Sequence, residues 1–356
     1  MKEYKTYTVR KGDTLKSIAE RLQINVQDLV SFHNKYSHTL LRNDFIGVTM
    51  FKEIYIPANL EEFRYKHAPN YFPLHYGDIL LSCEDIVIDE VTEMVLKEQK
   101  TIQTQTVQRF SIRQEEMDGH AVCVIDNIEI LKQQISPQYK PLANAISFLG
   151  LPLKHLILGI NPDGAIAKVI NQKEISERWQ SLKQTEEAQA LLTDKTIGKN
   201  IEQAMDTDYA QTFRVINETL RYRLLCPDFF GDQMLDEPRK RETNLMLLSN
   251  FFASHKVRFT LEESFRHLDN TDGIVATQRY SAEKGMQEEF SSIYYSTLKD
   301  YLQCPMNYSM DIKCTFNMSG SPLRMQDVVC HLEERLSDTT VFVNDIHIIY
   351  NHEQNK

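Results

Sequence analysis

Residues 7–34 read "YTVRKGDTLKSIAERLQINVQDLVSFHN", and this stretch decides the fold at the N-terminal end of the chain. Its first three residues are aromatic or β-branched, which favours a short strand. The following Lys-Gly-Asp-Thr predicts a turn in which Gly12 adopts a positive φ. Asp13 is predicted to cap the next helix, because its carboxylate can accept from free backbone N–H groups of the first turn. The apolar residues after it recur with helical spacing: Leu15, Ile18, Ala19 and Leu22.

A second helix is predicted to begin after Asn25, which can serve as its N-cap, with Asp28 in the capping-box position. Further along, "IYIP" at residues 54–57 predicts a second strand that ends at a proline. The predicted order is therefore strand, helix, helix, strand.

This order, together with "YTVRKGDTLKSIA" and the closing "IYIP", resembles the LysM domain over about residues 5–57. The resemblance implies a non-catalytic module for glycans that contain N-acetylglucosamine, either peptidoglycan or chitin. It places a shallow groove between the strand-to-helix loop and the loop after the second helix. Carried over by position, the glycan-binding residues are Gly12, Asp13, Thr14, Leu15, Asn34, Lys35 and Tyr36.

Two features depart from the family pattern. Lys16 stands where the family often has an aromatic residue, and the run at residues 34–54 is longer than the usual second loop. That run carries several apolar residues, so it could enlarge the groove, cover it or dock on the rest of the chain. Gly12, Asp13 and Thr14 can equally be explained by turn and cap chemistry alone.

Composition limits the classes of function. The 356 residues are 42% hydrophobic and 25% charged, which is ordinary for a globular protein with two or three domains. Residues 1–57 hold nine Lys and Arg against six Asp and Glu, whereas the remainder holds 31 against 44. An acidic body argues against nucleic acid as a partner. No secretory signal or transmembrane segment is recognised, so a cytoplasmic location is expected unless a larger assembly carries the protein to the envelope.

The search for chemistry finds no nucleotide-binding, zinc-protease or serine-hydrolase motif, and we expect a non-enzymatic protein without metal or cofactor. The six cysteines form no C-x-x-C pair and are expected to be reduced: Cys83, Cys123, Cys226, Cys304, Cys314 and Cys330. "CHLEE" at residues 330–334 places a thiol near acidic groups. On the helix expected there, Cys330 and Glu334 are neighbours and His331 points elsewhere.

The rest of the chain predicts an α+β fold, in which an antiparallel sheet carries a helical insertion. Residues 58–78 are a packed connector, and residues 79–356 form the body. We expect strands at 79–171, helices at 172–252, and strands with one helix at 324–336 in 253–356. Two similar hairpins are predicted, with turns at 161–164 and 270–273. Trp179, the only tryptophan, is predicted to lie in the core between helices and sheet.

Two functions remain open. The first is a LysM protein that binds peptidoglycan or another GlcNAc-containing glycan, while the acidic body holds or positions a protein partner. The second is a structural adaptor of a contractile injection system or phage-tail-like assembly, in which the LysM unit serves for packing.

Overall fold

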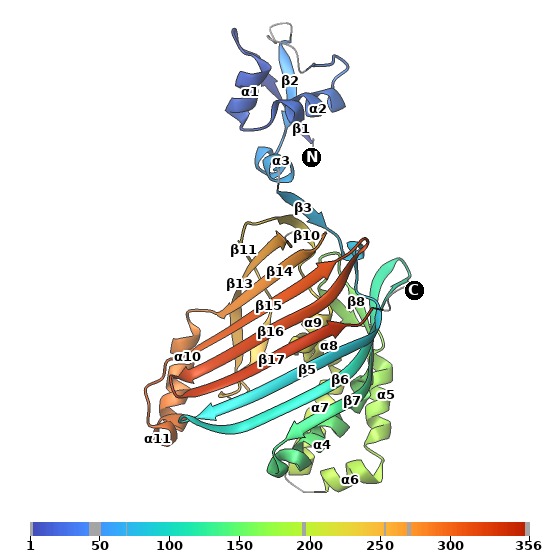
Figure 1. The fold of residues 1–356 in the computed structure, drawn as a ribbon, viewed down its shortest axis with the longest axis vertical. Helices are drawn as coiled ribbons and strands as arrows, with labels where there is room; N and C mark the ends of the chain where they lie inside the picture. The colour runs from blue at the N-terminus through green and yellow to red at the C-terminus, as the bar shows by residue number, and fades with distance from the viewer. Residues whose placement is uncertain are drawn as a thin grey trace. The chain divides into compact units, whose positions relative to one another are not determined.

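The computed structural model describes residues 3–42, 51–68, 70–193, 197–252, 254–268 and 272–352. The chain divides into two compact units, Met1–Phe72 and Pro73–Lys356. Figure 1 shows the first in blue and the second from pale blue to red.

The first unit has the βααβ order that the sequence predicts. Its elements are β1 (Tyr4–Thr8), α1 (Leu15–Leu22), α2 (Val26–Tyr36), β2 (Glu53–Pro57) and the additional α3 (Leu60–Lys66). The two strands pair antiparallel, with Tyr4 opposite Pro57 and Thr8 opposite Glu53. Both helices and β2 bury their apolar side chains in one small core: Leu15, Ile18, Ala19, Leu22, Leu29, Val30, Leu41, Ile54 and Ile56.

The helix caps agree with the sequence at α2 and differ at α1. Asn25 caps α2 as predicted, because its side chain accepts from the N–H of Gln27. The predicted cap of α1 was wrong by one residue: Thr14, not Asp13, is the N-cap. Thr14 Oγ1 accepts from the N–H of Ser17 at 3.1 Å, and Ser17 Oγ accepts from the N–H of Thr14 at 2.9 Å. This capping box leaves the Asp13 carboxylate available for other contacts.

The second unit is built on one 13-stranded sheet, with strand order β11-β13-β14-β15-β16-β17-β5-β6-β7-β8-β9. Neighbours on this path pair antiparallel, β12 joins β13, and β4 pairs parallel with β16. The strands of this unit, including β3 at its start and β10, are β3 (Tyr71–Leu74), β4 (Ile79–Leu80), β5 (Cys83–Leu96), β6 (Gln99–Met117), β7 (His120–Ile135), β8 (His155–Ile160), β9 (Ile166–Val169), β10 (Gly231–Met234), β11 (Arg239–Arg241), β12 (Met246–Leu248), β13 (Lys256–His267), β14 (Ile274–Ala282), β15 (Ser309–Ser319), β16 (Leu323–Ser337) and β17 (Thr340–Tyr350).

Along the chain, the helices of this unit follow one strand of the sheet and precede another. They are α4 (Lys140–Leu149), α5 (Gln172–Leu182), α6 (Glu186–Leu192), α7 (Ile197–Ala210), α8 (Thr212–Asn217), α9 (Leu220–Leu225), α10 (Met286–Ile293) and α11 (Lys299–Leu302). In Figure 1, α7, α8 and α9 lie behind the sheet, on one face. The α+β architecture with a helical insertion is confirmed.

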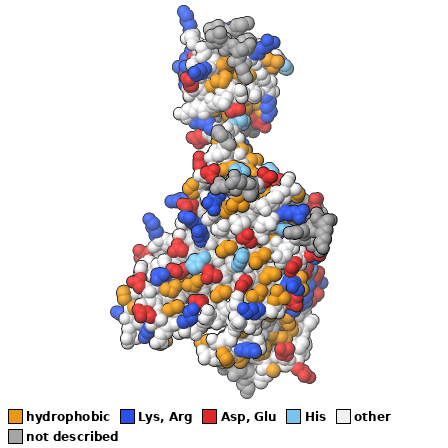
Figure 2. Space-filling view, viewed as in Figure 1, with side chains coloured by type: hydrophobic (Ala, Val, Ile, Leu, Met, Phe, Trp, Pro, Cys, Tyr) orange, Lys and Arg blue, Asp and Glu red, His pale blue; other side chains and the backbone are white. Residues whose placement is uncertain are grey.

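On the opposite face of the sheet, Figure 2 shows charged, histidine and apolar side chains mixed together. Alternation along the strands explains this division. In β15, for example, Ile312 and Cys314 are buried on the helix-covered face, whereas Asp311 and Lys313 are exposed on the other.

Three expected elements differ in the structure. The helix expected at 324–336 is wrong, because this segment is β16. The helical region ends at Leu225, so residues 226–252 hold β10, β11 and β12 instead. Conversely, α4 is a helix within 79–171, where only strands were expected.

The first predicted hairpin is confirmed as β8 and β9. Gly164 in its turn has a φ of +86°, and a Cβ there would lie 2.2 Å from the carbonyl oxygen of Pro227. Glycine is therefore required both by conformation and by space. The second hairpin is β13 and β14, but residues 270 and 271 of its predicted turn lie outside the described residues.

Trp179 is fully buried, as expected, and joins α5 to α7. Its indole N–H donates to Asp206 at 2.7 Å, and its ring lies 5.4 Å from that of Tyr209. Lys183 also binds Asp206, at 2.7 Å. These contacts connect helix to helix.

Candidate functional site

The loop between β1 and α1 is fixed from inside by the Asp13 carboxylate, which is only 5% exposed. It accepts from the backbone N–H of Arg10 at 2.8 Å and from the hydroxyl of Tyr7 at 3.2 Å. Arg21 of α1 completes the set with an ion pair at 3.0 Å. Asp13 therefore holds the loop in shape, and its side chain points into the module and away from any ligand.

Gly12, Thr14 and Leu15 expose little of their side chains on the surface of the loop. Gly12 is exposed with a φ of +93°, and a Cβ added to it would meet no atom of the described residues within 4 Å. Leu15 is 2% exposed, so its side chain belongs to the core. Thr14 is half-buried, and its hydroxyl is used in the helix cap. The surface offered to a ligand is thus the open backbone of the loop.

On the second predicted wall, Asn34 has a structural task. Its Oδ1 accepts from the N–H of Leu41 at 2.7 Å, and its Nδ2 donates to the carbonyl of Leu41 at 2.9 Å. Both halves of the amide therefore hold the chain that leaves α2 against the helix.

Lys35 and Tyr36 lie at the other end of β1 from the Gly12 loop. The Tyr36 hydroxyl donates to Glu3, and its ring lies 5.0 Å from that of Tyr4. Lys35 Nζ is 3.8 Å from the Glu3 carboxylate. The hydrogen bond from Tyr36 and the charge of Lys35 lower the pKa of Glu3. Because Tyr4 and Thr8 are the two ends of β1, the structure does not bring Lys35 and Tyr36 to Gly12–Leu15.

The chain that enters β2 lies closer to the Gly12 loop. The N–H of Val9 donates to the carbonyl of Lys52 at 3.0 Å, so residues 51–53 run beside the end of β1. Residues 43–50, which belong to the predicted second wall and include part of the apolar run, lie outside the described residues.

Sequence reasoning missed Tyr7 and Arg21 as members of this site. Both act through Asp13, and the Arg21 guanidinium also contacts the Tyr7 hydroxyl. The sequence holds one indication of this ion pair, because Arg21 is a cation on the helix that follows the turn containing Asp13. Only the fold shows that the two meet.

In the second unit, "CHLEE" does not form a nucleophilic site. Because residues 330–334 are a strand, Cys330 and Glu334 face the buried side, whereas His331 faces the open side and contacts Asp345 at 2.6 Å. Cys330 Sγ lies 2.9 Å from Cys314 Sγ. Glu334 is fully buried and bound by donors from Ser249, Asn250 and Tyr308.

The six cysteines are free thiols, as expected, but they are not all equally buried. Cys314 and Cys330 are buried, whereas Cys304 is half-buried. Cys226 lies 3.5 Å from Cys123, and their contact together with burial raises the pKa of the Cys226 thiol. Within the described part of the chain, no group of three His, Cys, Asp or Glu side chains is arranged to hold a metal ion.

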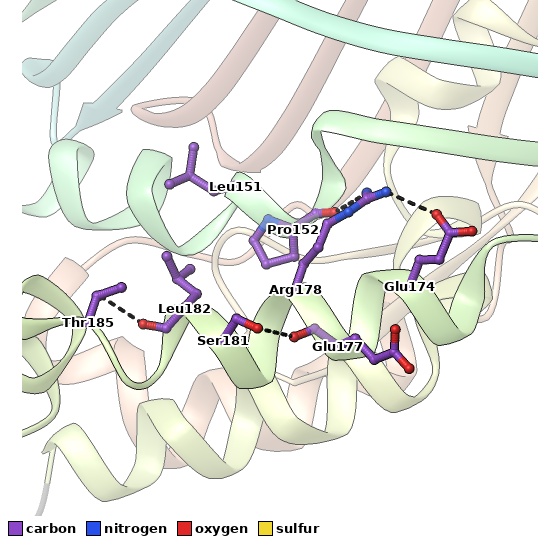
Figure 3. A pocket seen from close by; sticks show the side chains of 8 residues that line it. All are labelled: Leu151, Pro152, Glu174, Glu177, Arg178, Ser181, Leu182 and Thr185. Carbon is purple, nitrogen blue, oxygen red and sulfur yellow. Dashed lines mark hydrogen bonds and ion pairs between the residues drawn. The ribbon is translucent and has the colours of Figure 1, made fainter.

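A surface groove of about 610 Å³ lies between α5 and the short helix η3 (Leu151–Lys154). Figure 3 shows Arg178 at its centre, bound to Glu174 and to the carbonyl of Pro152. The hydroxyl of Ser181 donates to the carbonyl of Glu177. The bond from Arg178 to Pro152 joins α5 to η3, and the other two bonds lie within α5, so each of these polar groups has a partner.

The fold and the loop define a protein of two units whose first is a small βααβ module with an open loop before α1. Residues 7–40 match the family model of the LysM domain, so this module is a LysM domain, and the rest of the chain is assigned to no family. The family recognition is confirmed.

Comparison with curated proteins finds no match. Among solved structures, one described as "lipid-protein interactions in lipovitellin" is similar to 80% of this chain, with 6% identity and a TM-score of 0.40. The chain spans 25% of that protein's length. A likeness this weak tells us nothing about the fold or function of this chain.

No helix in the described ranges combines the length and apolar character needed to cross a bilayer. The adaptor role in an injection system, the absence of enzymatic activity and the cytoplasmic location are tested by none of these comparisons and stay predictions.

Proposed function

We propose that the LysM module binds a glycan that contains N-acetylglucosamine, such as peptidoglycan, through the backbone of residues 12–15. The observation that carries the proposal is the Gly12 loop, which is open on its outer side and fixed on its inner side by Asp13. A loop held in one shape loses little conformational entropy when a ligand binds.

The chemistry of the loop suits an acetamido sugar. The backbone of Gly12 and the carbonyl of Asp13 can pair with the acetamide, whereas the N–H groups of Asp13 and Thr14 already donate to Arg10 and Ser17. The Thr14 methyl group can offer an apolar contact to the sugar. Such shallow sites give weak affinity per sugar. Residues 51–53, which run beside Val9, are better placed for the second wall than Lys35 and Tyr36.

The test is a titration of the ¹⁵N-labelled full chain with chitin oligomers, followed by amide NMR shifts. We expect the amides of Gly12, Asp13, Thr14 and Leu15 to shift together and saturably. Thr14→Trp should abolish the shifts by filling the space above the loop. Glu20→Trp is the matched control, because Glu20 is an exposed residue of α1 one and a half turns away, and it should leave them intact.

Thr14→Trp also removes the helix cap at a cost of about 0.5–2 kcal/mol, so dispersed amide signals must first show that the module is folded. If millimolar oligomers move none of the loop amides in the wild-type chain, the proposal is wrong.

A further inference from the structure

A second groove, of about 650 Å³, lies entirely within the second unit and has no role in the function proposed above. Its floor is the helix-covered face of β6 and β7, and its walls come from α4, η3 and the start of α9. The volume falls in the range of roughly 300–1,000 Å³ that is usual for small-molecule sites.

One wall of this groove is apolar, although none of the described residues buries it. Helix α4 has no buried residue, and Ile146, which lines the groove, is 62% exposed. On β7, Ile130 lines the groove at 44% exposure and stands beside the exposed Leu131. Of the exposed apolar side chains between residues 128 and 146, Ile130 and Ile146 line the groove, and Ile135, Ala143 and Phe148 line it beside them.

The floor consists mainly of uncharged side chains, and Glu129 of β7 is the one carboxylate among the described residues that line it. The floor is formed in part by Thr104, Thr106 and Gln108 of β6 and by Gln133 of β7. Because none of them carries a charge, an apolar chain can lie over them without burying an ion.

Three charged side chains line the groove, Glu129, Lys154 and Arg221. Glu129 binds Arg109 at 2.5 Å, and Arg109 also pairs with Asp85 at 3.1 Å. Arg221 is neutralised by Glu90. Lys154, in contrast, forms no ion pair with any described residue, so one uncompensated positive charge stands at the exposed end of η3.

We propose that this groove binds a single-chain amphiphile with an anionic head group, of the class of long-chain carboxylates. The chain contacts the apolar wall at Ile130 and Ile146, and the carboxylate pairs with the Lys154 ammonium. The irregular pairing of β7 with β6 makes a peptide strand a poorer occupant, because bulges disturb the edge that such a strand would need.

The experiment is calorimetric titration of the full chain with octanoate, decanoate and dodecanoate below their micelle concentrations. We expect one saturable site, and each two-carbon extension should tighten binding about tenfold. Binding that is absent, or independent of chain length, would overturn the proposal.

Two variants of α4 form a matched pair. Ile146→Asp places a charge on the apolar wall and should weaken dodecanoate binding at least tenfold. Leu142→Asp lies on the same helix with nearly equal exposure, 60%, but does not line the groove, and should leave binding unchanged. An equal loss of dodecanoate affinity in both variants would indicate nonspecific adsorption on the apolar surface and would contradict the proposed site. Both positions are exposed, so neither change disturbs the core.

The head group is tested separately at Lys154. Lys154→Gln should weaken dodecanoate about tenfold and leave the uncharged dodecyl maltoside unaffected. Lys173→Gln, at a residue whose side chain is 90% exposed on α5, is the control for net charge. If Lys154→Gln weakens both ligands alike or neither of them, the assignment of the carboxylate to Lys154 is wrong.

Discussion

Asp13 is the residue on which the shape of the Gly12 loop depends. Its buried carboxylate serves Arg10, Tyr7 and Arg21 at once. Asp13→Ala should lower the free energy of unfolding of the module by about 1–3 kcal/mol, because it leaves these donors without their acceptor. Chemical denaturation followed on the amide signals of the module measures this loss. Glu20→Ala, at an exposed position of α1, should cost almost nothing, and a similar loss there would contradict the role given to Asp13.

His33 makes the stability of the module depend on pH. It is 2% exposed, its Nδ1 accepts from the N–H of Tyr55, and burial lowers its pKa. The unfolded chain therefore takes up a proton at His33 at a higher pH than the folded chain. Stability should be full above the unfolded pKa of about 6.5 and should fall as the pH drops towards the lowered folded value.

Thermal unfolding of the module between pH 7.5 and pH 5 tests this, with the His33 ring titrated by NMR. We expect the melting temperature to fall over that interval in the wild type. The His33→Gln variant should have a lower melting temperature than the wild type at pH 7.5. Its melting temperature should fall less than that of the wild type between pH 7.5 and pH 5. A His33 that titrates at or above the ordinary value would show that the sign of the effect is wrong.

At the scale of elements, Glu334 of β16 fixes the loop between β12 and β13. Its carboxylate accepts from the N–H of Asn250 at 2.7 Å, from the hydroxyl of Tyr308 at 3.0 Å and from Ser249. Glu334→Ala should destabilise the second unit by about 2–4 kcal/mol, since several buried donors lose their partner. Glu333→Ala, on the open face and paired with Arg335, should cost less than about 1 kcal/mol. Urea unfolding of both variants decides the matter, and equal losses would refute the role of Glu334.

The same residue shows why part of the fold could not be predicted. Residues 328–336 alternate between buried and exposed, as a strand requires. The buried Glu334 interrupts the apolar pattern, so the segment resembles a helix with a charged face. Its partners Ser249 and Tyr308 are distant in sequence, and only the tertiary structure shows that this carboxylate is satisfied.

The module could be predicted almost completely, because its caps and turns depend on neighbours within a few residues. The order of elements and the Asn25 cap follow from local spacing. The proposed glycan site brings together only the first of the two predicted groups of residues. Gly12 and Thr14 belong to one local loop, whereas the position of Tyr36 depends on which end of β1 it meets across the module. Local patterns carry no information about that contact.

At the scale of the whole molecule, each compact unit has a hydrophobic core of its own, and that of Met1–Phe72 is small. We expect hydrogen exchange in the full chain to be faster in this unit than in β15–β17, because a small core stabilises weakly. Mass spectrometry of exchanged peptides measures the difference. Equal protection of both units would contradict independent opening.

The central claim is that the LysM module binds a glycan of the cell-wall type through the Gly12 loop. Co-sedimentation of the full chain with insoluble peptidoglycan tests it most directly, with soluble chitin oligomers as competitors and Thr14→Trp and Glu20→Trp as paired variants. We predict that the wild type and Glu20→Trp sediment with the polymer, that the oligomers release them, and that Thr14→Trp stays in solution. A chain that does not sediment, or that sediments equally well as Thr14→Trp and with excess oligomer, would contradict the account.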